Sequence, residues 1–220
     1  EIDRVRPRVV FLCNPNNPTG QALSPSEIAH ILDVLGDGLL IVDEAYIDLA
    51  DGVESVDGLR RQDCRLVILR SLTKSHGLAG LRLGYLLADP EIVRAVSLSQ
   101  PPWSVNAYAQ AAGFAALGDD EYLQEGRRLA RRARTYLVDG LEQLGLSCVP
   151  TRASFWLVRV GDGRLARTEL LRRGILVRDA RSFGLPVYIR VSVRPLEECE
   201  RLLAVLSGLV SSGVLPVDQV

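Results

Sequence analysis

The chain has 220 residues, a formal net charge of -1, and 24% charged against 47% hydrophobic residues. This balance is typical of a soluble globular protein with a sizeable core and room for two domains. It argues against nucleic-acid binding, which needs an excess of Lys and Arg. No apolar run is long enough for a transmembrane helix, so we expect no membrane partner. The four cysteines form no C-x-x-C pair, which favours reduced thiols, a cytoplasmic location and no metal site.

The first 144 residues alternate short apolar runs with amphipathic segments. We expect strands at 8–13, 39–42, 66–69 and 83–88. Ser24, Pro25 and Glu27 have the pattern of a helix start with a capping box, and this helix is expected to end near Gly36 or Gly38. Short apolar strands that alternate with helices are typical of an α/β fold, a mostly parallel sheet with helices on both faces.

Later segments predict a second, smaller domain. Ser104 is expected to cap a helix at 107–117, and a long helix follows at about 120–144. We expect the five arginines between 127 and 134 to form a solvated face of this long helix. Beyond it we expect strands at 155–160, 175–177 and 188–193, with helices between and after them. We therefore expect domains at 1–144 and 145–220, the second an α+β domain with a frayed tail at 216–220.

The stretch that follows the third strand carries the strongest chemical signal. Ser71 and Lys74 leave the carboxyl end of that strand, and in open α/β sheets ligands bind at this edge. A lysine amine can form a Schiff base with pyridoxal phosphate, while the Ser71 hydroxyl and the Arg82 guanidinium suit a phosphate. Taken alone, the stretch also fits a solvated surface lysine near a glycine-rich turn.

Polar residues follow the first two strands as well. Asn17 lies in the loop after the first strand, and Asp43 and Tyr46 follow the second. A carboxylate at Asp43 would hold the proton on a pyridine nitrogen, and Asn17 and Tyr46 would hydrogen-bond the phenolic oxygen of the same ring. Lys74 would then also move the substrate's Cα proton.

These motifs, taken together, resemble a known family. N-P-T-G at 17–20, D-E-A-Y at 43–46 and S-x-x-K at 71–74, followed by Arg82, are similar in order and interval to the class I and II aminotransferases of fold type I. The similarity covers essentially the whole chain. Within the family it is greatest to histidinol-phosphate aminotransferases and to the threonine-phosphate decarboxylases of cobalamin synthesis. The resemblance implies pyridoxal 5'-phosphate as cofactor, a homodimer, and an amino donor and a 2-oxo acid as substrates.

The resemblance also implies a role for each matching residue. Lys74, Asp43 and Tyr46 would be catalytic, and the cofactor would be bound by Asn17, Asp43, Tyr46, Ser71, Lys74 and Arg82. Arg190, which could otherwise be a structural residue at a strand edge, would bind the substrate carboxylate.

The chain departs from the pattern of histidinol-phosphate aminotransferases at two places. Arg194 stands where a glycine is usual, and this arginine together with the segment 102–106 looks more like the decarboxylase branch. Arg194 either binds a substrate phosphate or is a solvated residue before a helix. Ser154 stands where many relatives have asparagine, which puts a substrate contact there in doubt.

Three functions remain open on these grounds. The first is transfer of an amino group between an amino acid or phosphorylated amino compound and a 2-oxo acid. The second is decarboxylation of threonine phosphate, and the third is a regulatory domain that keeps the fold without turnover. The sequence does not name the amino donor. It also contains no methionine, from which we expect the later part of a longer protein, inactive as these 220 residues alone.

Overall fold

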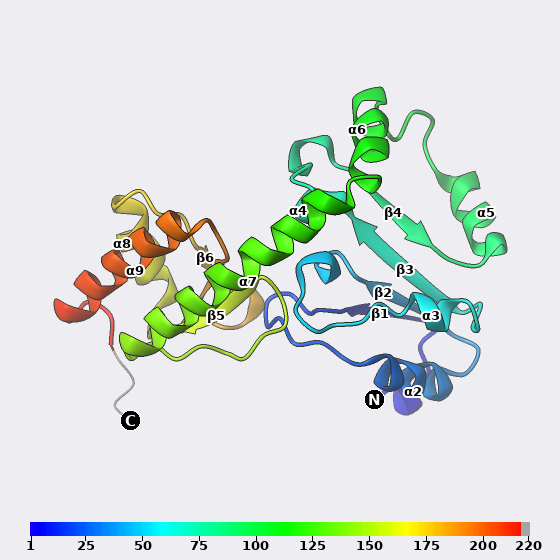
Figure 1. Cartoon of the computed structure of the whole chain (residues 1–220). Helices are drawn as coiled ribbons and strands as arrows, with labels where there is room; N and C mark the ends of the chain where they lie inside the picture. The colour runs from blue at the N-terminus through cyan, green and yellow to red at the C-terminus, as the bar shows by residue number, and fades with distance from the viewer. Residues whose placement is uncertain (217–220) are drawn as a thin grey trace. The chain divides into compact units, whose positions relative to one another are not determined.

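The computed structural model describes residues 1–216, and the rest of the expected frayed tail lies outside them. The chain divides into two compact units (Figure 1). Unit 1 comprises residues 1–16 and 22–126, and unit 2 comprises residues 17–21 and the chain from 127 onward. The division falls within helix α7 (Asp120–Gln143), and the expected domain boundary at 144 stays a prediction. None of the helices in residues 1–216 is long and apolar enough to cross a membrane.

Unit 1 contains a four-stranded sheet in the order β1-β2-β3-β4. Its strands are β1 (Val9–Cys13), β2 (Leu39–Asp43), β3 (Leu66–Ser71) and β4 (Gly84–Leu87). The first three strands are parallel, as the sequence predicts, whereas β4 runs antiparallel to β3. The segment between β3 and β4 holds only the single turns α4 and η2 rather than a crossover helix, and the chain turns back beside β3.

The helices of unit 1 follow the strands in sequence. They are α1 (Ile2–Val5), α2 (Pro25–Leu35), α3 (Asp57–Arg60), α4 (Leu72–Ser75), α5 (Pro90–Ser99) and α6 (Ala107–Leu117), with short 3-10 turns η1 (Ile47–Leu49) and η2 (Ala79–Leu81). Helix α2 packs Ile28 and Leu32 against Leu40 of β2 and Ile68 of β3, which forms the core of this unit. The alternate residues of β2 and β3 that face α2 are the fully buried ones.

The two helix starts that the sequence addresses have different outcomes. The capping box of α2 is confirmed: Ser24 Oγ accepts from the Glu27 amide, and the Glu27 carboxylate accepts from the Ser24 amide. The expected cap of α6 is wrong, because Asn106 Oδ1 accepts from the Ala109 amide at 2.9 Å. Ser104 lies two residues too early to reach the amides of the first turn.

Unit 2 is a three-stranded antiparallel sheet backed by helices. Its elements are β5 (Phe155–Arg159), α8 (Gly163–Arg172), β6 (Arg178–Asp179), η3 (Arg181–Phe183), β7 (Tyr188–Ser192) and α9 (Leu196–Ser211), and the strand order is β5-β7-β6. The expected strand at 175–177 is wrong. The Ile175 amide still bonds back to the Leu170 carbonyl at the end of α8, so pairing with β7 begins only at Arg178.

Candidate active site

Lys74 lies on α4, directly after β3, with an exposed side chain. Its Nζ donates a hydrogen bond to Thr73 Oγ1 at 3.1 Å and lies 5.7 Å from the centre of the Tyr46 ring. Tyr46 follows the neighbouring parallel strand β2. The ends of β2 and β3 therefore bring the amine and the phenol together, because parallel strands place their carboxyl ends at one edge of a sheet.

The other sequence-predicted residues of unit 1 lie near the same strand ends. Asp43 ends β2, and its Oδ1 accepts from the Ala45 amide at 2.9 Å. Ser71 caps α4, accepting from the Thr73 amide at 3.3 Å. Arg82 has a left-handed backbone, with φ of 57°, and its guanidinium donates to the Ala79 carbonyl at 2.9 Å. Since Ser71 pairs with Gly84 across β3 and β4, the return of the chain carries Arg82 back to the end of β3.

Asn17 and Arg190 meet within unit 2. The Arg190 guanidinium donates to Asn17 Oδ1, and its Cζ lies 5.0 Å from the centre of the Phe155 ring. Arg190 Nε is buried and has no hydrogen-bond partner among residues 1–216. The loop that carries Asn17 is packed closely, because a Cβ added at Gly20 would lie 1.7 Å from Thr151 Oγ1. The glycine of the N-P-T-G motif is thus required by this contact and by its φ of +70°.

A cavity of about 730 Å³ opens beside these strands in unit 2. Its charged lining residues are Arg167, Arg178, Arg190, Arg194, Arg201 and Glu198. Arg178 stands directly opposite Arg190 across β6 and β7. Arg194 forms a two-pronged ion pair with Glu198, at 2.9 and 3.1 Å. This pairing lowers the pKa of the Glu198 carboxyl and raises that of Arg194. The cavity is therefore strongly cationic.

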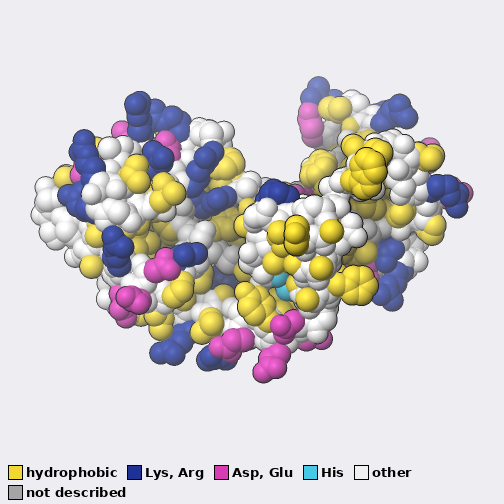
Figure 2. Space-filling model, turned by 90° about the horizontal axis from the view of Figure 1, so that it is seen from above, with side chains coloured by type: hydrophobic (Ala, Val, Ile, Leu, Met, Phe, Trp, Pro, Cys, Tyr) yellow, Lys and Arg dark blue, Asp and Glu magenta, His cyan; other side chains and the backbone are white. Residues whose placement is uncertain are grey.

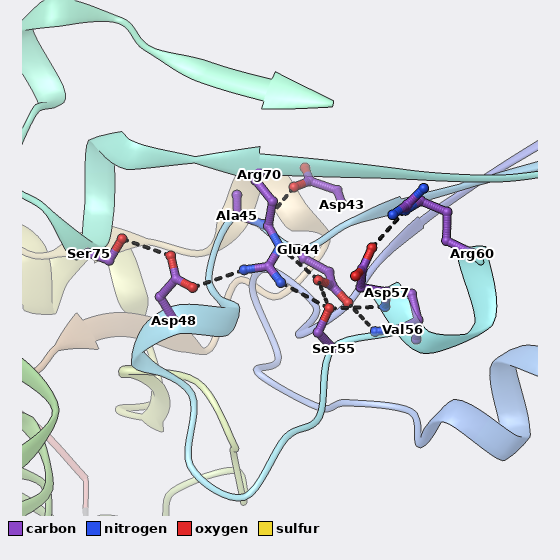
Figure 3. A network of polar contacts seen from close by, with 10 residues as sticks. All are labelled: Asp43, Glu44, Ala45, Asp48, Ser55, Val56, Asp57, Arg60, Arg70 and Ser75. Atoms are coloured by element: carbon purple, nitrogen blue, oxygen red, sulfur yellow. Dashed lines mark hydrogen bonds and ion pairs between the residues drawn. The ribbon is translucent and has the colours of Figure 1, made fainter. Parts of the chain in front are cut away.

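A buried polar network lies behind the strand ends of unit 1 (Figure 3). The Glu44 side chain is fully buried and accepts from Ser55 Oγ and from the Val56 amide, both at 2.8 Å. Arg70 Nε lies 2.9 Å from Glu44 Oε2 in an ion pair, with an angle that does not make it a hydrogen bond. A second Arg70 nitrogen donates to Ser55 Oγ at 2.9 Å.

The network continues from Arg70 to the helix that carries the lysine. Arg70 donates to Asp48 Oδ1 at 2.9 Å, and the other oxygen of Asp48 accepts from Ser75 Oγ at the same distance (Figure 3). At its other edge Asp57 is held by Arg60, whose hydrogen bond of 2.7 Å lowers the pKa of the Asp57 carboxyl. The network thus joins β2, β3 and α4 through charged hydrogen bonds.

The family model for aminotransferases of class I and II matches residues 1–206 of this chain. The chain belongs to the class I and II aminotransferase family. This confirms the resemblance drawn from the motifs. Among curated relatives, the histidinol-phosphate aminotransferase of Anaeromyxobacter sp. (strain Fw109-5) is 40% identical over 213 residues, which cover 94% of this chain and 58% of the relative.

Two solved structures are also similar to this aminotransferase chain. The histidinol-phosphate aminotransferase of Sinorhizobium meliloti in complex with pyridoxal-5'-phosphate has a TM-score of 0.85 and 27% identity, over 96% of this chain and 59% of its own. The L-threonine-O-3-phosphate decarboxylase of Porphyromonas gingivalis has a TM-score of 0.81 and 26% identity, over 92% and 64%. The neighbours confirm the expected fold class, and the chain spans less than two thirds of the length of each of these three proteins.

Sequence reasoning missed two arginines, one in each unit. It assigned no role to Arg70, although Arg70 shares the core-facing side of β3 with Leu66 and Ile68, and a charge in that register needs a buried partner. It also missed Arg178, because the strand was expected before that residue rather than at it. Arg178 and Asp179 are adjacent and form the whole strand, and a strand of only two residues gives no periodic signal.

Proposed function

We propose that the protein is a pyridoxal-phosphate-dependent aminotransferase. It moves an amino group from an amino acid or a phosphorylated amino compound, of which histidinol phosphate is the best-supported example, to a 2-oxo acid. The observation that carries the proposal is Lys74, an exposed amine at the carboxyl end of a parallel strand, beside Tyr46, in a chain of this family. The Anaeromyxobacter relative supports the reaction, and the Sinorhizobium structure supports the cofactor.

The side chains present fit pyridoxal phosphate group by group. Within unit 1, the Lys74 amine suits its aldehyde, Asp43 its protonated ring nitrogen, Tyr46 its phenolic oxygen, and Ser71 and Arg82 its phosphate. Asn17 accepts from Arg190 through Oδ1, which leaves its NH₂ group to donate. When bound, this cofactor acts as an electron sink for the bonds at the substrate's Cα. Lys74 Nζ would then move the Cα proton, and the Asp43 carboxylate would hold a proton on the ring nitrogen.

The cationic cavity supports an anionic substrate with two charged groups. Arg178 and Arg190 face each other across neighbouring strands, and like charges in that position repel unless an anion lies between them. Arg190, with a buried Nε that still has a hydrogen to donate, would bind the carboxylate as a fork. Arg178 would then bind the phosphate. Arg194 could take part only after exchanging Glu198 for that phosphate.

Decarboxylation of threonine phosphate is the second candidate. It is favoured by the Porphyromonas structure and by the presence of Arg194 beside the cavity. The two reactions are separated by their products. Glutamate formed from histidinol phosphate and 2-oxoglutarate, without carbon dioxide, supports transamination, whereas carbon dioxide released from threonine phosphate without an oxo acid supports the alternative.

Assembly as a homodimer belongs to the same proposal. Several large apolar side chains of unit 1 are exposed, among them Leu98, Trp103, Tyr108 and Phe114, and Figure 2 shows apolar groups gathered on the face seen from above. Exposed apolar patches of this kind mark protein–protein interfaces. A cytoplasmic location is also part of the proposal, supported by the four cysteines, none of which forms a disulfide within residues 1–216.

The test of the cofactor assignment is chemical labelling of Lys74. The holoprotein is reduced with borohydride, digested and mapped by mass spectrometry. We expect the pyridoxyl group on Lys74, and we expect Lys74→Ala to lose both the label and turnover. Lys74 is the single lysine among these 220 residues. Lys74→Arg is the matched control, because it keeps the positive charge but has no primary amine, and it should also lose the label. A pyridoxyl group retained by Lys74→Arg would refute the assignment.

A further inference from the structure

Helix α4 is too short to be stable by itself. It has four residues, Leu72–Ser75, and a single helical turn in water is disfavoured because nucleation fixes more dihedral angles than it forms hydrogen bonds. Side chains therefore hold it at both ends. Ser71 caps the beginning, and at the other end Ser75, only 7% exposed, bonds to Asp48 Oδ2 at 2.9 Å. Lys74 lies between these two points.

The hydrogen bonds at the end of α4 have a definite direction. The hydroxyl of Ser75 has one hydrogen, and it contacts both Asp48 Oδ2 and His76 Nδ1, each at 2.9 Å. A carboxylate only accepts, so Ser75 donates to Asp48. Ser75 Oγ must then accept from His76, which places a hydrogen on Nδ1. Arg70 donates to the other carboxylate oxygen of Asp48, Oδ1, at 2.9 Å, and so fixes the Asp48 end of this series of hydrogen bonds.

An aromatic contact fixes the His76 end of this series of hydrogen bonds. The His76 ring stacks on Tyr122 of α7, with ring centres 6.4 Å apart and planes at 20°. The next residue, Gly77, has a φ of +68° and lies near the Tyr122 hydroxyl, so the backbone turns away from α4 immediately after the stacked ring. His76 is thus held by its ring face as well as by its Nδ1 hydrogen.

We propose that His76, Ser75 and Asp48 form a directed hydrogen-bond relay, His76 Nδ1–H to Ser75 Oγ–H to Asp48, whose function is to position Lys74. The three are positioning residues, because they act through α4 and not on a substrate. The importance of the amine they position rests on the function proposed above. The relay anchors the lysine's own helical turn to Arg70 of β3 on one side and to α7 on the other.

The test compares variants that keep or remove the Nδ1 donor. His76→Asn retains an N–H at about the place of Nδ1, whereas His76→Leu and Ser75→Ala break the relay. Ser97→Ala is the matched control, because Ser97 is an exposed serine of α5 whose hydroxyl donates to the Val93 carbonyl of its own helix. Nitrogen-15 NMR of the histidine rings should show the Nδ1–H form for His76, lost in Ser75→Ala. Hydrogen exchange at residues 72–75 should accelerate in both broken variants, in cofactor-free protein as well as in holoprotein.

Turnover provides the second readout. One lost hydrogen bond of this kind is worth about 1 kcal/mol, so we expect kcat to fall roughly fivefold to tenfold in His76→Leu and Ser75→Ala, with KM changed less than about twofold. His76→Asn should restore most of that loss, and Ser97→Ala should match wild type. An Nε2–H form of His76, or unaltered exchange at 72–75, would overturn the relay even if Lys74 carries the cofactor. Failure of Lys74 to take the label would instead refute the proposed function and the relay's purpose, while the tautomer stayed as stated.

Discussion

At the scale of single residues, the most consequential group is the buried carboxylate of Glu44. An ionised carboxyl is stable away from water only when it is paired and hydrogen-bonded. Glu44 meets this condition through Ser55, Val56 and the guanidinium of Arg70, whose side chain is only 15% exposed. The same guanidinium serves Asp48, so one cation satisfies two acids.

Replacement of Arg70 therefore tests the whole network. We expect Arg70→Met to lower the free energy of unfolding by about 3 kcal/mol, because it leaves Glu44 buried without its counter-ion. The matched control is Arg94→Met on the exposed side of α5, which should change stability by less than about 0.5 kcal/mol. Urea denaturation of both variants gives the comparison. Equal losses in the two variants would mean that Arg70 is not a structural counter-ion.

The positions of Asp43, Ser71 and Lys74 at strand ends could be predicted because they depend on local apolar runs and on one rule of sheet topology. The contact between Asp48 and Arg70 could not, since these residues are 22 positions apart and their meeting depends on the path of the chain after β2. The hydrogen bond between Asn17 and Arg190 could not be predicted from a local sequence pattern either, because the two residues are 173 positions apart.

At the scale of elements, local chemistry decided which expectations held. The capping box of α2 is encoded within four residues, so the sequence was sufficient to predict it. The start of α6 offered two good caps, Ser104 and Asn106, and only the register of the helix selects one. For β6 the decisive factor was the end of α8, which still occupies the Ile175 amide. Strand pairing there is a tertiary property.

The cap of α2 yields a prediction at this scale. Ser24→Ala removes the hydroxyl that accepts from the Glu27 amide and should lower the free energy of unfolding by about 1 kcal/mol. Ser24→Thr keeps a capping hydroxyl and should lose much less. Thermal and urea unfolding of the three proteins measure the difference. If Ala and Thr prove equivalent, the cap does not contribute to the stability of the folded state.

At the scale of the whole molecule, the notable feature is that several large apolar side chains are exposed to solvent in the described residues. Helix α6 carries Tyr108 and Phe114 at 83% and 89% exposure, and Trp103 just before it is 96% exposed. Its remaining residues are mostly alanine, so the helix has no polar face to present to water. A helix that is apolar all round needs contacts on every side, which supports the proposed association of subunits.

Phe114→Glu should weaken that association. A charge placed at the centre of an apolar interface loses its hydration without gaining a partner, so we expect the dimer to dissociate at micromolar concentration. Sedimentation velocity measures the change directly. Leu171→Glu, on an exposed position of α8 in unit 2, is the control and should sediment as wild type. A Phe114→Glu protein that remains dimeric would place the interface elsewhere.

The strand order β1-β2-β3-β4 has a consequence for how the site is made. Each strand pairs with the one that precedes it along the chain, so the sheet of unit 1 can grow by adding one neighbour at a time. The groups around Lys74 come from the ends of β2 and β3 and from the turn before β4, so the set is complete only once β4 has paired. We expect pulsed hydrogen exchange during refolding to protect β1 and β2 before β4. The protein would then acquire its proposed cofactor only after β4 has paired, which makes binding competence a late event in the life of each newly made chain.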